Sequence, residues 1–568
     1  MKQTALSVSV EDLKVPYNQL VTIAIPSAFA LLFHLAVQYR EPYSHHFLIG
    51  LASTLTALTV VLHDEWKITH SAAFSVALSM FGVFTVTIFT SMAIYRVFFH
   101  PLRNIPGLLS CKLSMWSWPI TDWFGTRQYK IQDMHKNLGD VVRIGPREVS
   151  CSDPSALTAI YGPTGAGAKT VRGPWYGAQS MIPHVHSLQN EPTLPEHNRR
   201  RRDWDPAFST KALSGYHENI YRNADMLLDQ IEKLSKKGPF DLKESLLCFG
   251  FDMMGELGFA RSFGTLKDGK TSHVVHLVEL GVRAINTIGN VPYLAHIMRF
   301  LPSPIQAFES WLEAAVKWRM SKQGEREFVD ADIFAFLLGE EGKQRRKLDK
   351  RELQQDCMLV VVAGSDTTSN ALAFCLYELA RQPRLVEMIR EELEVHFPNG
   401  AKPENFDVLR DDAPLLNACL HEVLRLWPPV PSGLQRTTTT EMTLPNGNSS
   451  VVVPPNTVVS THTWTMHRDP RNFHKPNNFL PERWINEPKS KREVHNAKAW
   501  SPFGFGTTSC IGKNLAYMEM RLVLAQFIMR FDFTMEPADA QDFRDSIRDQ
   551  FVSAAGQMIC SVSPRHQW

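Results

Sequence analysis

The sequence lacks the paired cysteines that a disulfide framework or a zinc site requires. Eight cysteines are scattered over 568 residues, without a CxxC pair or a regular spacing. Such scattered thiols are typical of a reducing, cytosol-facing domain. They stand at Cys111, Cys151, Cys248, Cys357, Cys375, Cys419, Cys510 and Cys560.

The sequence also lacks a large net charge. The formal charge is +2 and there is no basic low-complexity tail, so the composition does not favour nucleic acid as a partner. A compact basic start followed by a small-residue cleavage site is missing too, which argues against a signal peptide. Apolar residues are abundant: 44% of the chain is hydrophobic and 21% is charged, which is enough for a large folded core.

Long apolar runs are confined to the first hundred residues. They cover Leu20–Gln38, Phe47–Leu62 and Ala72–Phe99. A membrane-spanning helix needs roughly 20 apolar residues, so the third run is long enough and the second is short. We expect an N-terminal membrane region at residues 1–99 with up to three transmembrane helices. The alternative is that one run anchors the chain while the others lie on the membrane surface or pack together.

A proline-containing hinge is expected at residues 100–107, followed by one catalytic domain at residues 108–568. Pro101 and Pro106 stop a helix and stiffen the exit from the membrane. Arg96 and Arg103 favour a cytosolic end for the third run.

Periodicity and turn residues predict the other elements. We expect a strand pair at 141–150, a hairpin that turns at Asn446 and Gly447, and a strand over Thr457–Thr465. Gly162–Thr193 is expected to be one long loop. Helices are expected at Arg127–Leu138, Ala212–Lys236, Leu242–Phe259, Ser272–Ile288 and Ile305–Met320.

Cys510 stands apart from the other cysteines because of its surroundings, the stretch SPFGFGTTSCIGKN. Three glycines let the backbone approach a flat object closely, and Phe503 offers it an aromatic face. A thiolate at the start of a helix is a metal ligand or a nucleophile. No histidine base accompanies it in this stretch, whereas ligation of heme iron by one thiolate fits. A buried inert thiol is the simplest alternative for a lone cysteine.

A second unusual stretch, Ala363–Thr368, lies inside a long apolar helix expected over Gln355–Arg381. A glycine in mid-helix costs about 1 kcal/mol relative to alanine, and Ser, Asp and Thr compete for backbone hydrogen bonds. We therefore expect the helix to weaken here. A tolerated kink is one interpretation; the other is a groove for a ligand, with the acid Asp366 and the alcohol Thr367 beside it.

Four consecutive arginines occur in the stretch EHNRRRRDW. A solvated basic face is the default interpretation of such a run. His197 and Arg201 are four residues apart, so on a helix they share one face and together offer two donors to a carboxylate. The other arginines of the run are then free to face a partner protein.

These stretches, in this order, resemble the motifs of the cytochrome P-450 family. The Cys510 stretch is similar to the heme signature Phe-x-x-Gly-x-Arg-x-Cys-x-Gly, with Thr508 in place of the Arg. Ala363–Thr368 matches the family's oxygen-binding motif at every position. By this resemblance Cys510 ligates the iron of heme b, and Asp366 and Thr367 relay protons to dioxygen.

The resemblance also assigns the groups that hold the heme propionates. The helix with His197 and Arg201 is similar to the family's propionate-binding helix, with His197 at its Trp position, and Arg436 matches a further propionate position. Because Thr508 lacks the charged fork of an arginine, we expect Arg201 and Arg436 to carry most of the anchoring.

Glu422 and Arg425 resemble the family's Glu-x-x-Arg motif, for which Arg483 supplies the second arginine. This implies a structural role near the heme. The resemblance further implies that Val360, Val361, Ala363, Val430 to Leu434 and the last turn at Phe551–Gln557 line the substrate pocket.

The resemblance covers residues 108–568. It implies a mainly α fold with a small β portion, the cytochrome P-450 fold, preceded by N-terminal transmembrane helices. It also implies a monooxygenase that inserts one oxygen atom of dioxygen into a small hydrophobic organic substrate. NADPH would supply electrons through a membrane-bound NADPH-cytochrome reductase, and the chain would sit in the endoplasmic reticulum membrane with its catalytic domain facing the cytosol.

Three stretches, Lys169–Tyr176, Pro195–Ser209 and Ser509–Met520, look most like filamentous-fungal members that tailor secondary metabolites, including the tryprostatin hydroxylase type. Two other functions stay open. One is a heme-thiolate isomerase or dehydratase without a reductase, which would not need the Asp366 and Thr367 pair. The other is a non-catalytic membrane heme-binding protein, which would not need the groove at Ala363–Thr368.

Overall fold

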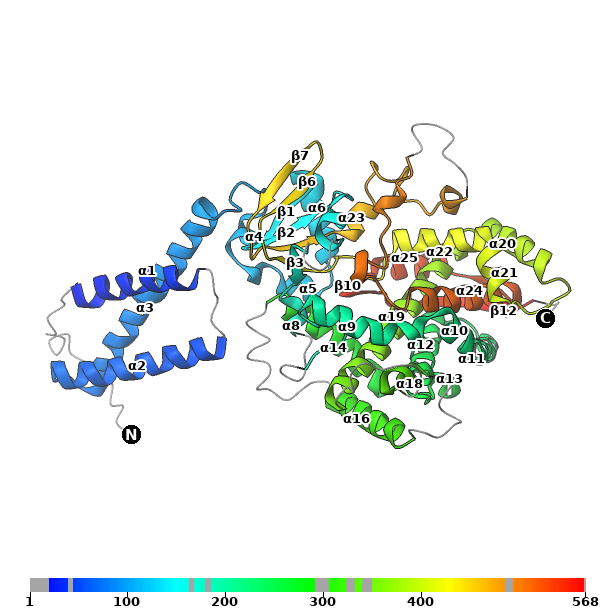
Figure 1. Cartoon of the computed structure of the whole chain (residues 1–568), viewed down its shortest axis with the longest axis horizontal. Coiled ribbons are helices and arrows are strands. Elements are labelled where there is room, and N and C mark those ends of the chain that lie inside the picture. Colours follow the sequence, from blue (N-terminus) through cyan, green and yellow to red (C-terminus); the bar gives the residue numbers. More distant parts are fainter. Residues whose placement is uncertain are drawn as a thin grey trace, which may run out of the picture. The chain divides into compact units, whose positions relative to one another are not determined.

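The computed structural model describes residues 20–38, 44–162, 168–178, 185–291, 306–322, 332–339, 350–485 and 494–565. Contacts divide the chain into two compact units. One contains the residues up to Asn104, and the other contains nearly all of the chain from Ile105 onward. Helices dominate both units, and the strands belong to the second (Figure 1).

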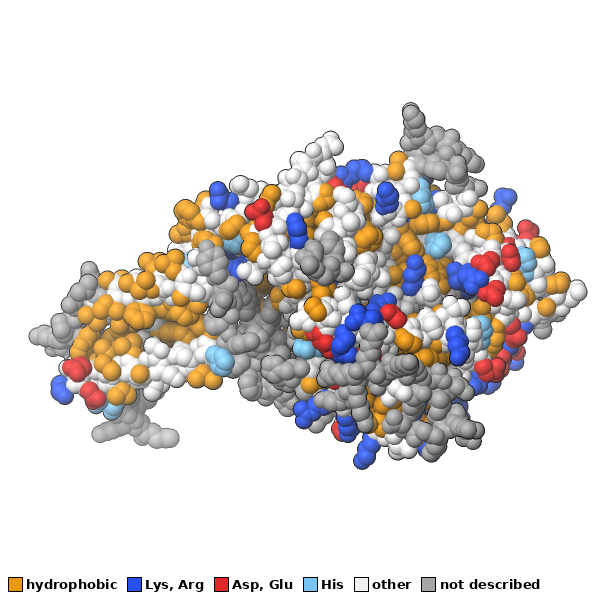
Figure 2. Space-filling view, viewed as in Figure 1, with side chains coloured by type: hydrophobic (Ala, Val, Ile, Leu, Met, Phe, Trp, Pro, Cys, Tyr) orange, Lys and Arg blue, Asp and Glu red, His pale blue; other side chains and the backbone are white. Residues whose placement is uncertain are grey.

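The N-terminal unit consists of three helices, α1 (Ile25–Val37), α2 (Ser44–Trp66) and α3 (His70–Ile94), with a π-helical turn at each end of the unit. Within them, 46–66 and 70–99 are long and apolar enough to cross a membrane, whereas 21–37 is a shorter apolar helix. The helix that contains the second apolar run, Phe47–Leu62, is thus longer than that run, because it extends beyond the apolar residues at both ends. Large apolar side chains cover much of this unit's surface, among them Phe29 and Phe89 (Figure 2).

The second unit is built on a set of helices, most of them short, around one long helix. They are α4 (Leu109–Leu113), α5 (Pro119–Trp123), α6 (Arg127–Leu138), α7 (Ala156–Tyr161), α8 (Trp175–Ala178), α9 (Leu194–Trp204), α10 (Thr210–Gly215), α11 (His217–Ser235), α12 (Leu242–Phe259), α13 (Thr265–Asp268), α14 (His273–Gly289), α16 (Gln306–Ser321), α18 (Ile333–Leu338), α19 (Lys350–Ala380), α20 (Pro383–His396), α21 (Phe406–Asp411), α22 (Pro414–Leu426), α23 (Thr463–His467), α24 (Lys513–Arg530) and α25 (Pro537–Asp545).

The strands form small sheets at the side of this helical body (Figure 1). The largest has the order β1-β2-β8-β5-β3, and smaller ones pair β6 with β7, β10 with β11, and β12 with β4 and β9. The strands are β1 (Val141–Gly145), β2 (Glu148–Cys151), β3 (Thr170–Arg172), β4 (Phe240–Asp241), β5 (Arg436–Thr438), β6 (Met442–Asn446), β7 (Ser449–Val453), β8 (Val458–Thr461), β9 (Phe531–Thr534), β10 (Arg548–Gln550), β11 (Val552–Ala554) and β12 (Ile559–Pro564).

Helix α19 is the centre of the core and packs most extensively on α12. Glycines make this close packing possible, because a Cβ on Gly250 would collide with Ser369 and one on Gly364 would collide with Met254. Although α19 is long and apolar enough for a membrane span, most of it is buried inside the protein. Gly364 therefore has a packing role as well as the predicted role beside a ligand.

Three sequence predictions need correction. Helix α19 runs without a break through Ala363–Thr368, where Gly364 packs closely on Met254 of α12. Gly162–Thr193 is not one loop: its described residues include β3 and α8, and the rest lies outside the described residues. The strand expected over Thr457–Thr465 ends at Thr461, where α23 soon begins. The strand pair at 141–150 and the hairpin at Asn446 and Gly447 are confirmed.

Candidate active site

A cavity of about 390 Å³ lies beside α19 in the second unit. Its walls are mostly apolar, and the α19 positions that face it include Leu359, Ala363 and Thr367, which repeat every four residues. Val360 faces it as predicted, whereas Val361 is fully buried in the protein core. Of the candidate site residues from the sequence, six line this cavity: Cys510, Thr367, Arg201, Arg436, His197 and Phe503.

The Cys510 loop presents the thiol to the cavity just before α24 begins. The backbone N–H of Cys510 donates to the carbonyl of Phe503 at 2.8 Å. Gly506 has φ of +72°, and a Cβ there would meet the Tyr161 carbonyl, so this turn needs glycine. Burial raises the pKa of the Cys510 thiol, while the backbone N–H of Gly512 and the charge of Arg201 oppose that rise.

Arg436 contacts Thr508, the residue that stands at the expected arginine position of the cysteine loop. Its side chain is 2% exposed, and its Nη2 donates to the Thr508 hydroxyl at 2.7 Å. Thr508 thus acts as an acceptor that helps to orient Arg436. The Arg436 guanidinium lies 5.2 Å from the ring centre of Tyr161, a further contact that fixes its direction.

Arg172 is a cation of this cavity that the sequence analysis missed. The antiparallel pairing of β3 with β5 sets Arg172 opposite Arg436. Its Nη1 donates to the hydroxyl of Tyr176 at 3.2 Å, but its Nε is buried and has no hydrogen-bond partner. Burial lowers the pKa of Arg172 to about 10, and nearby Arg436 contributes to the same shift, so the guanidinium stays charged at neutral pH.

His197 and Arg201 lie on the same face of α9, as predicted, and both line the cavity. Burial lowers the pKa of His197 to about 4, so this side chain is neutral at pH 7 and offers a hydrogen bond without charge. Arg201 donates to Asp205 and to the Ser509 carbonyl, both at 2.8 Å. It therefore ties α9 to the cysteine loop.

Arg200, from the same run of arginines, corrects a prediction. We expected the arginines other than Arg201 to be free for a partner protein. Arg200 is instead buried and pairs with Asp356 of α19 at 2.6 Å. Arg199 pairs with Glu196 and Asp203 of its own helix, and of the four arginines only Arg202 is exposed.

These residues fit a heme. Three arginines line the cavity, whereas Glu519 is the one acidic side chain among the described residues that line it. Burial raises the pKa of Glu519 to about 8, so this carboxyl is neutral at pH 7. Arg201 is paired with Asp205, so the surplus of positive charge in this apolar cavity comes from Arg172 and Arg436. That surplus and the unpartnered Nε of Arg172 suit a flat apolar ligand with carboxylates at one edge. Cys510 offers the thiolate ligand that heme iron accepts.

Thr367 and Asp366 occupy neighbouring faces of α19. The Thr367 hydroxyl lines the cavity and donates to the Ala363 carbonyl at 2.6 Å. Asp366 is buried, is not among the described residues that line the cavity, and has one carboxyl oxygen without a hydrogen-bond partner. Burial raises its pKa to about 7; the charge of Glu279 adds to the rise and Lys243 opposes it. An acid that can exchange its proton near neutral pH thus stands next to the cavity's alcohol.

The predicted cluster of Glu422 with two arginines is present and fully formed. Glu422 accepts from Arg425 at 2.7 Å and from Arg483 at 3.1 Å, and its side chain is inaccessible to solvent. Burial alone would raise the pKa of Glu422, but the two arginines outweigh it and the net shift is downward. Arg425 also donates to the His467 and Asn478 carbonyls, so the cluster fixes the chain beyond α23. Glu422 is absent from the described cavity lining, which fits a structural role.

Comparisons with known proteins agree with this geometry. The model of the cytochrome P-450 family matches residues 115–558. A cytochrome P-450 monooxygenase of Fusarium pseudograminearum is 32% identical over 496 residues, which cover 86% of this chain and 86% of that protein. A cytochrome P-450 monooxygenase of Hypoxylon pulicicidum is 33% identical over 457 residues, 79% of this chain and 80% of that protein. The tryprostatin B 6-hydroxylase of Aspergillus fumigatus is 30% identical over 492 residues, 86% of this chain and 85% of that protein.

Proposed function

The chain belongs to the cytochrome P-450 family of monooxygenases, and from this premise we propose that it oxidises a small hydrophobic metabolite with electrons that NADPH delivers through a reductase. The observation that carries the proposal is one apolar cavity that brings together the Cys510 thiol, three arginines and the Thr367 hydroxyl. An acyl-transfer or hydrolytic site would need a base beside the thiol, and no described side chain hydrogen-bonds it as one.

Each group of residues has a separate task in this proposal. Cys510 holds the iron, and Arg172, Arg201 and Arg436 hold the propionates. A thiolate-bound heme supplies the activation of dioxygen, from which one oxygen atom enters the substrate and the other leaves as water. The apolar walls exclude bulk water and position the substrate near the Thr367 side of α19.

The proton supply is the task of Asp366 and Thr367. Asp366 serves as the proton donor beside the cavity, because burial keeps its carboxyl partly protonated near neutral pH. It passes the proton toward the cavity, where Thr367 can release its bond to the Ala363 carbonyl and donate into the cavity. A group with a pKa of about 7 is well suited to this transfer at neutral pH.

The substrate we propose is apolar and carries at least one hydrogen-bond donor. Gln355 lies two turns before Ala363 on the same face of α19 and lines the cavity. Its amide oxygen is buried without a partner, and an N–H or O–H of the substrate would satisfy it. Three relatives of fungal origin, one of them a tryprostatin B hydroxylase, support a role in fungal secondary metabolism.

The location we propose is the endoplasmic reticulum membrane, with the catalytic domain (108–568) on the cytosolic side of a hinge at 100–107. Two N-terminal helices of spanning length support a membrane anchor. Arg96 and Arg103, at the end of the last of them, support the cytosolic orientation.

The test is expression of the full chain with a fungal NADPH-cytochrome reductase, followed by product analysis against metabolite extracts. We expect an oxidised product whose formation consumes NADPH and stops when the reductase is omitted. Turnover that persists without the reductase would favour an isomerase or dehydratase, and reduction without any product would favour a heme-binding protein.

The variant that tests the iron ligand is Cys510→Ser, in which oxygen replaces the sulfur of the candidate ligand. We expect loss of the carbon monoxide absorbance band that is typical of thiolate-bound heme. A Cys375→Ser variant, in a buried cysteine outside the described cavity lining, should keep the band. Retention of the band in Cys510→Ser would rule out Cys510 as the ligand.

A further inference from the structure

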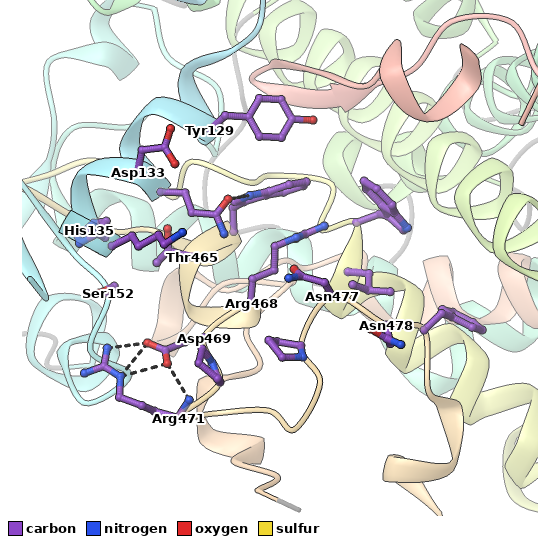
Figure 3. Close-up of a pocket in the computed structure, with 18 of the residues that line it drawn as sticks. Tyr129, Asp133, His135, Ser152, Thr465, Arg468, Asp469, Arg471, Asn477 and Asn478 are labelled. Atoms are coloured by element: carbon purple, nitrogen blue, oxygen red, sulfur yellow. Dashed lines mark hydrogen bonds and ion pairs between the residues drawn. The ribbon is translucent and has the colours of Figure 1, made fainter. Parts of the chain in front are cut away.

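A second and larger cavity, of about 1780 Å³, opens between α6, the end of α19 and the segment that follows α23. Its described lining residues include none of those that line the heme cavity. Three aromatic side chains, Tyr129, Trp427 and Trp464, form an aromatic wall on one side. Figure 3 shows Arg468 extending into this space, with Tyr129 above it and Asn477 nearby.

Arg468 is a cation with a buried hydrogen-bond donor that has no acceptor in the described part of the chain. Its guanidinium carbon lies 3.3 Å from the ring centre of Trp464 and 5.2 Å from that of Trp427. Its Nη1 is buried and has no hydrogen-bond partner in the described part of the chain. The two rings compensate the charge through their faces, but a ring face cannot satisfy N–H groups that point along the guanidinium plane.

Arg471, three residues further on, shows how the same segment treats an arginine with partners. It binds Asp469 at 2.6 Å, as Figure 3 shows, and Asp140 at 2.9 Å. Both carboxylates are consumed by these contacts, so they do not serve Arg468. The two arginines of this loop therefore differ in their hydrogen bonds: Arg471 has carboxylate partners, whereas a buried N–H of Arg468 has none in the described part of the chain.

The charges around Arg468 leave a positive surplus. Asp133, Glu378 and Asp545 also line the cavity, but no ion pair joins them to Arg468 in the described part of the chain. Glu378, the acid that acts on the pKa of Arg468, already accepts from Trp427 at 2.9 Å and pairs with Arg381 at 3.3 Å. Arg544 lines the same cavity and is exposed. Burial lowers the pKa of Arg468, and Arg425 and Arg544 lower it further, while Tyr129 and Glu378 oppose them. Arg425 pairs with Glu422, which it shares with Arg483. Among the described residues, neither Arg468 nor Arg544 forms an ion pair with a carboxylate.

We propose that this cavity is a binding site for a small oxyanion, the carboxylate or phosphate group of a small molecule, with Arg468 as its principal donor and Arg544 as the cation at its entrance. A planar guanidinium fork pairs with two oxygens of such a group. The rings of Trp464 and Trp427 fix the plane of the fork in advance, which reduces the entropy lost on binding. The Tyr129 ring, 5.5 Å from that of Trp464, extends the aromatic wall along which the body of the ligand can lie.

The test measures thermal unfolding of the heme-loaded full chain in lipid nanodiscs. Inorganic phosphate and, separately, succinate are titrated against chloride at constant ionic strength. A ligand that binds the folded state raises the unfolding temperature in a saturable way. We expect saturation by at least one of the two anions, and the anion that gives it identifies the oxyanion class.

Three variants separate binding at this site from the general effect of salts. Arg468→Gln and Arg544→Gln should each raise the midpoint concentration about tenfold, the loss expected for one charge-assisted hydrogen bond. Arg471→Gln removes the same charge from the same loop, but its donors are already satisfied, so the midpoint should not rise. Arg544 is exposed, which keeps that variant folded if Arg468→Gln proves unstable.

The proposal is wrong if neither phosphate nor succinate saturates above the chloride baseline. It is equally wrong if Arg544→Gln leaves the midpoint unchanged, or if Arg471→Gln raises it as much as the other two variants do. None of these outcomes depends on monooxygenase activity, so the proposed function stands or falls separately.

Discussion

At the scale of single residues, Asp366 carries a carboxyl group in an environment that disfavours its ionised form. It is 6% exposed, one of its carboxyl oxygens has no partner, and its pKa is raised to about 7 from an ordinary value of 3.8. Burial is the main cause. An isolated buried carboxyl is costly for stability, and this cost is consistent with the role in proton transfer that we propose for Asp366.

Asp366→Asn removes the exchangeable proton and keeps the shape of the side chain. We expect product formation to fall by about 10²-fold, the usual share of a positioned proton donor, with the heme spectrum unchanged. The rate of the native enzyme should change between pH 6 and 8, where a group of pKa about 7 titrates, and the variant should lose that limb. A variant with the native rate and the same pH profile would remove Asp366 from the proton path.

The stability of the same variant provides an independent measurement. Between about pH 4 and pH 7 Asp366 is ionised in the unfolded chain but protonated in the folded one, so rising pH lowers the free energy of unfolding across this window. Asn cannot ionise. The variant should therefore be more stable than the native chain at pH 8, and the difference should shrink toward pH 4.

The sequence predicted those site residues that lie in a recognisable local motif. It did not predict site residues whose position depends on contacts with distant parts of the chain. The letters around Cys510 and Thr367 indicated a ligand and an alcohol, and the structure brings both to one cavity. Arg172 had no such signature, because its role depends on a strand partner more than 260 residues away in sequence. Nothing in the sequence distinguishes Arg468 from other loop arginines, because its contacts with the rings of Trp464 and Trp427 are visible only in the structure.

At the scale of elements, the pairing of β3 with β5 sets the cation pair of the heme cavity. Successive side chains of a strand point to opposite faces, so the register that sets Arg172 opposite Arg436 directs both guanidinium groups to one side. Tyr176 of α8 accepts from both, at 3.2 Å and 3.4 Å. A short strand in a segment expected to be a loop thus adds a second cation beside Arg436.

We therefore expect Arg172→Ala and Arg436→Ala each to speed the release of heme to apomyoglobin by about tenfold, the effect of one charge-assisted hydrogen bond. The double variant should lose heme faster than either single variant, because both arginines bind the same edge of the ligand. Thr437→Ala, between Arg436 and Thr438 on β5, perturbs the strand without removing a cation and is the matched control. Unchanged release in both single variants would contradict the anchoring role.

Most helices were predictable to within a few residues because their apolar faces repeat at the helical period. Arg127–Leu138 and Leu242–Phe259 coincide with α6 and α12. Irregular segments were harder. Nothing in the letters of Lys169–Tyr176 indicates β3, since three residues suffice for that strand and its stability comes entirely from pairing with β5. The close packing of α19 on α12 through Gly250 and Gly364 likewise cannot be derived from local helix propensity.

At the scale of the whole molecule, the two units bury separate cores. The large cluster of buried apolar residues runs from Leu188 to Val562, whereas a small one, from Leu62 to Met80, belongs to the N-terminal helices. The heme cavity is lined by described residues from Leu157 onward. None of the described residues that line the cavity belongs to the N-terminal helices, so we expect the N-terminal unit and the chemistry to be separable parts of the chain.

Deletion of residues 1–99 is expected to remove integral membrane attachment while leaving heme binding intact. The full chain should stay with membranes during extraction with alkaline carbonate, since helices of spanning length are held by the hydrocarbon core. The shortened chain keeps an exposed apolar patch that includes Trp116, Ile120 and Phe124, so it should still bind vesicles, but reversibly and extractably. Its carbon monoxide spectrum should match that of the full chain. Carbonate resistance of the shortened chain, or loss of its heme, would show that anchor and catalytic domain are not separable in this way.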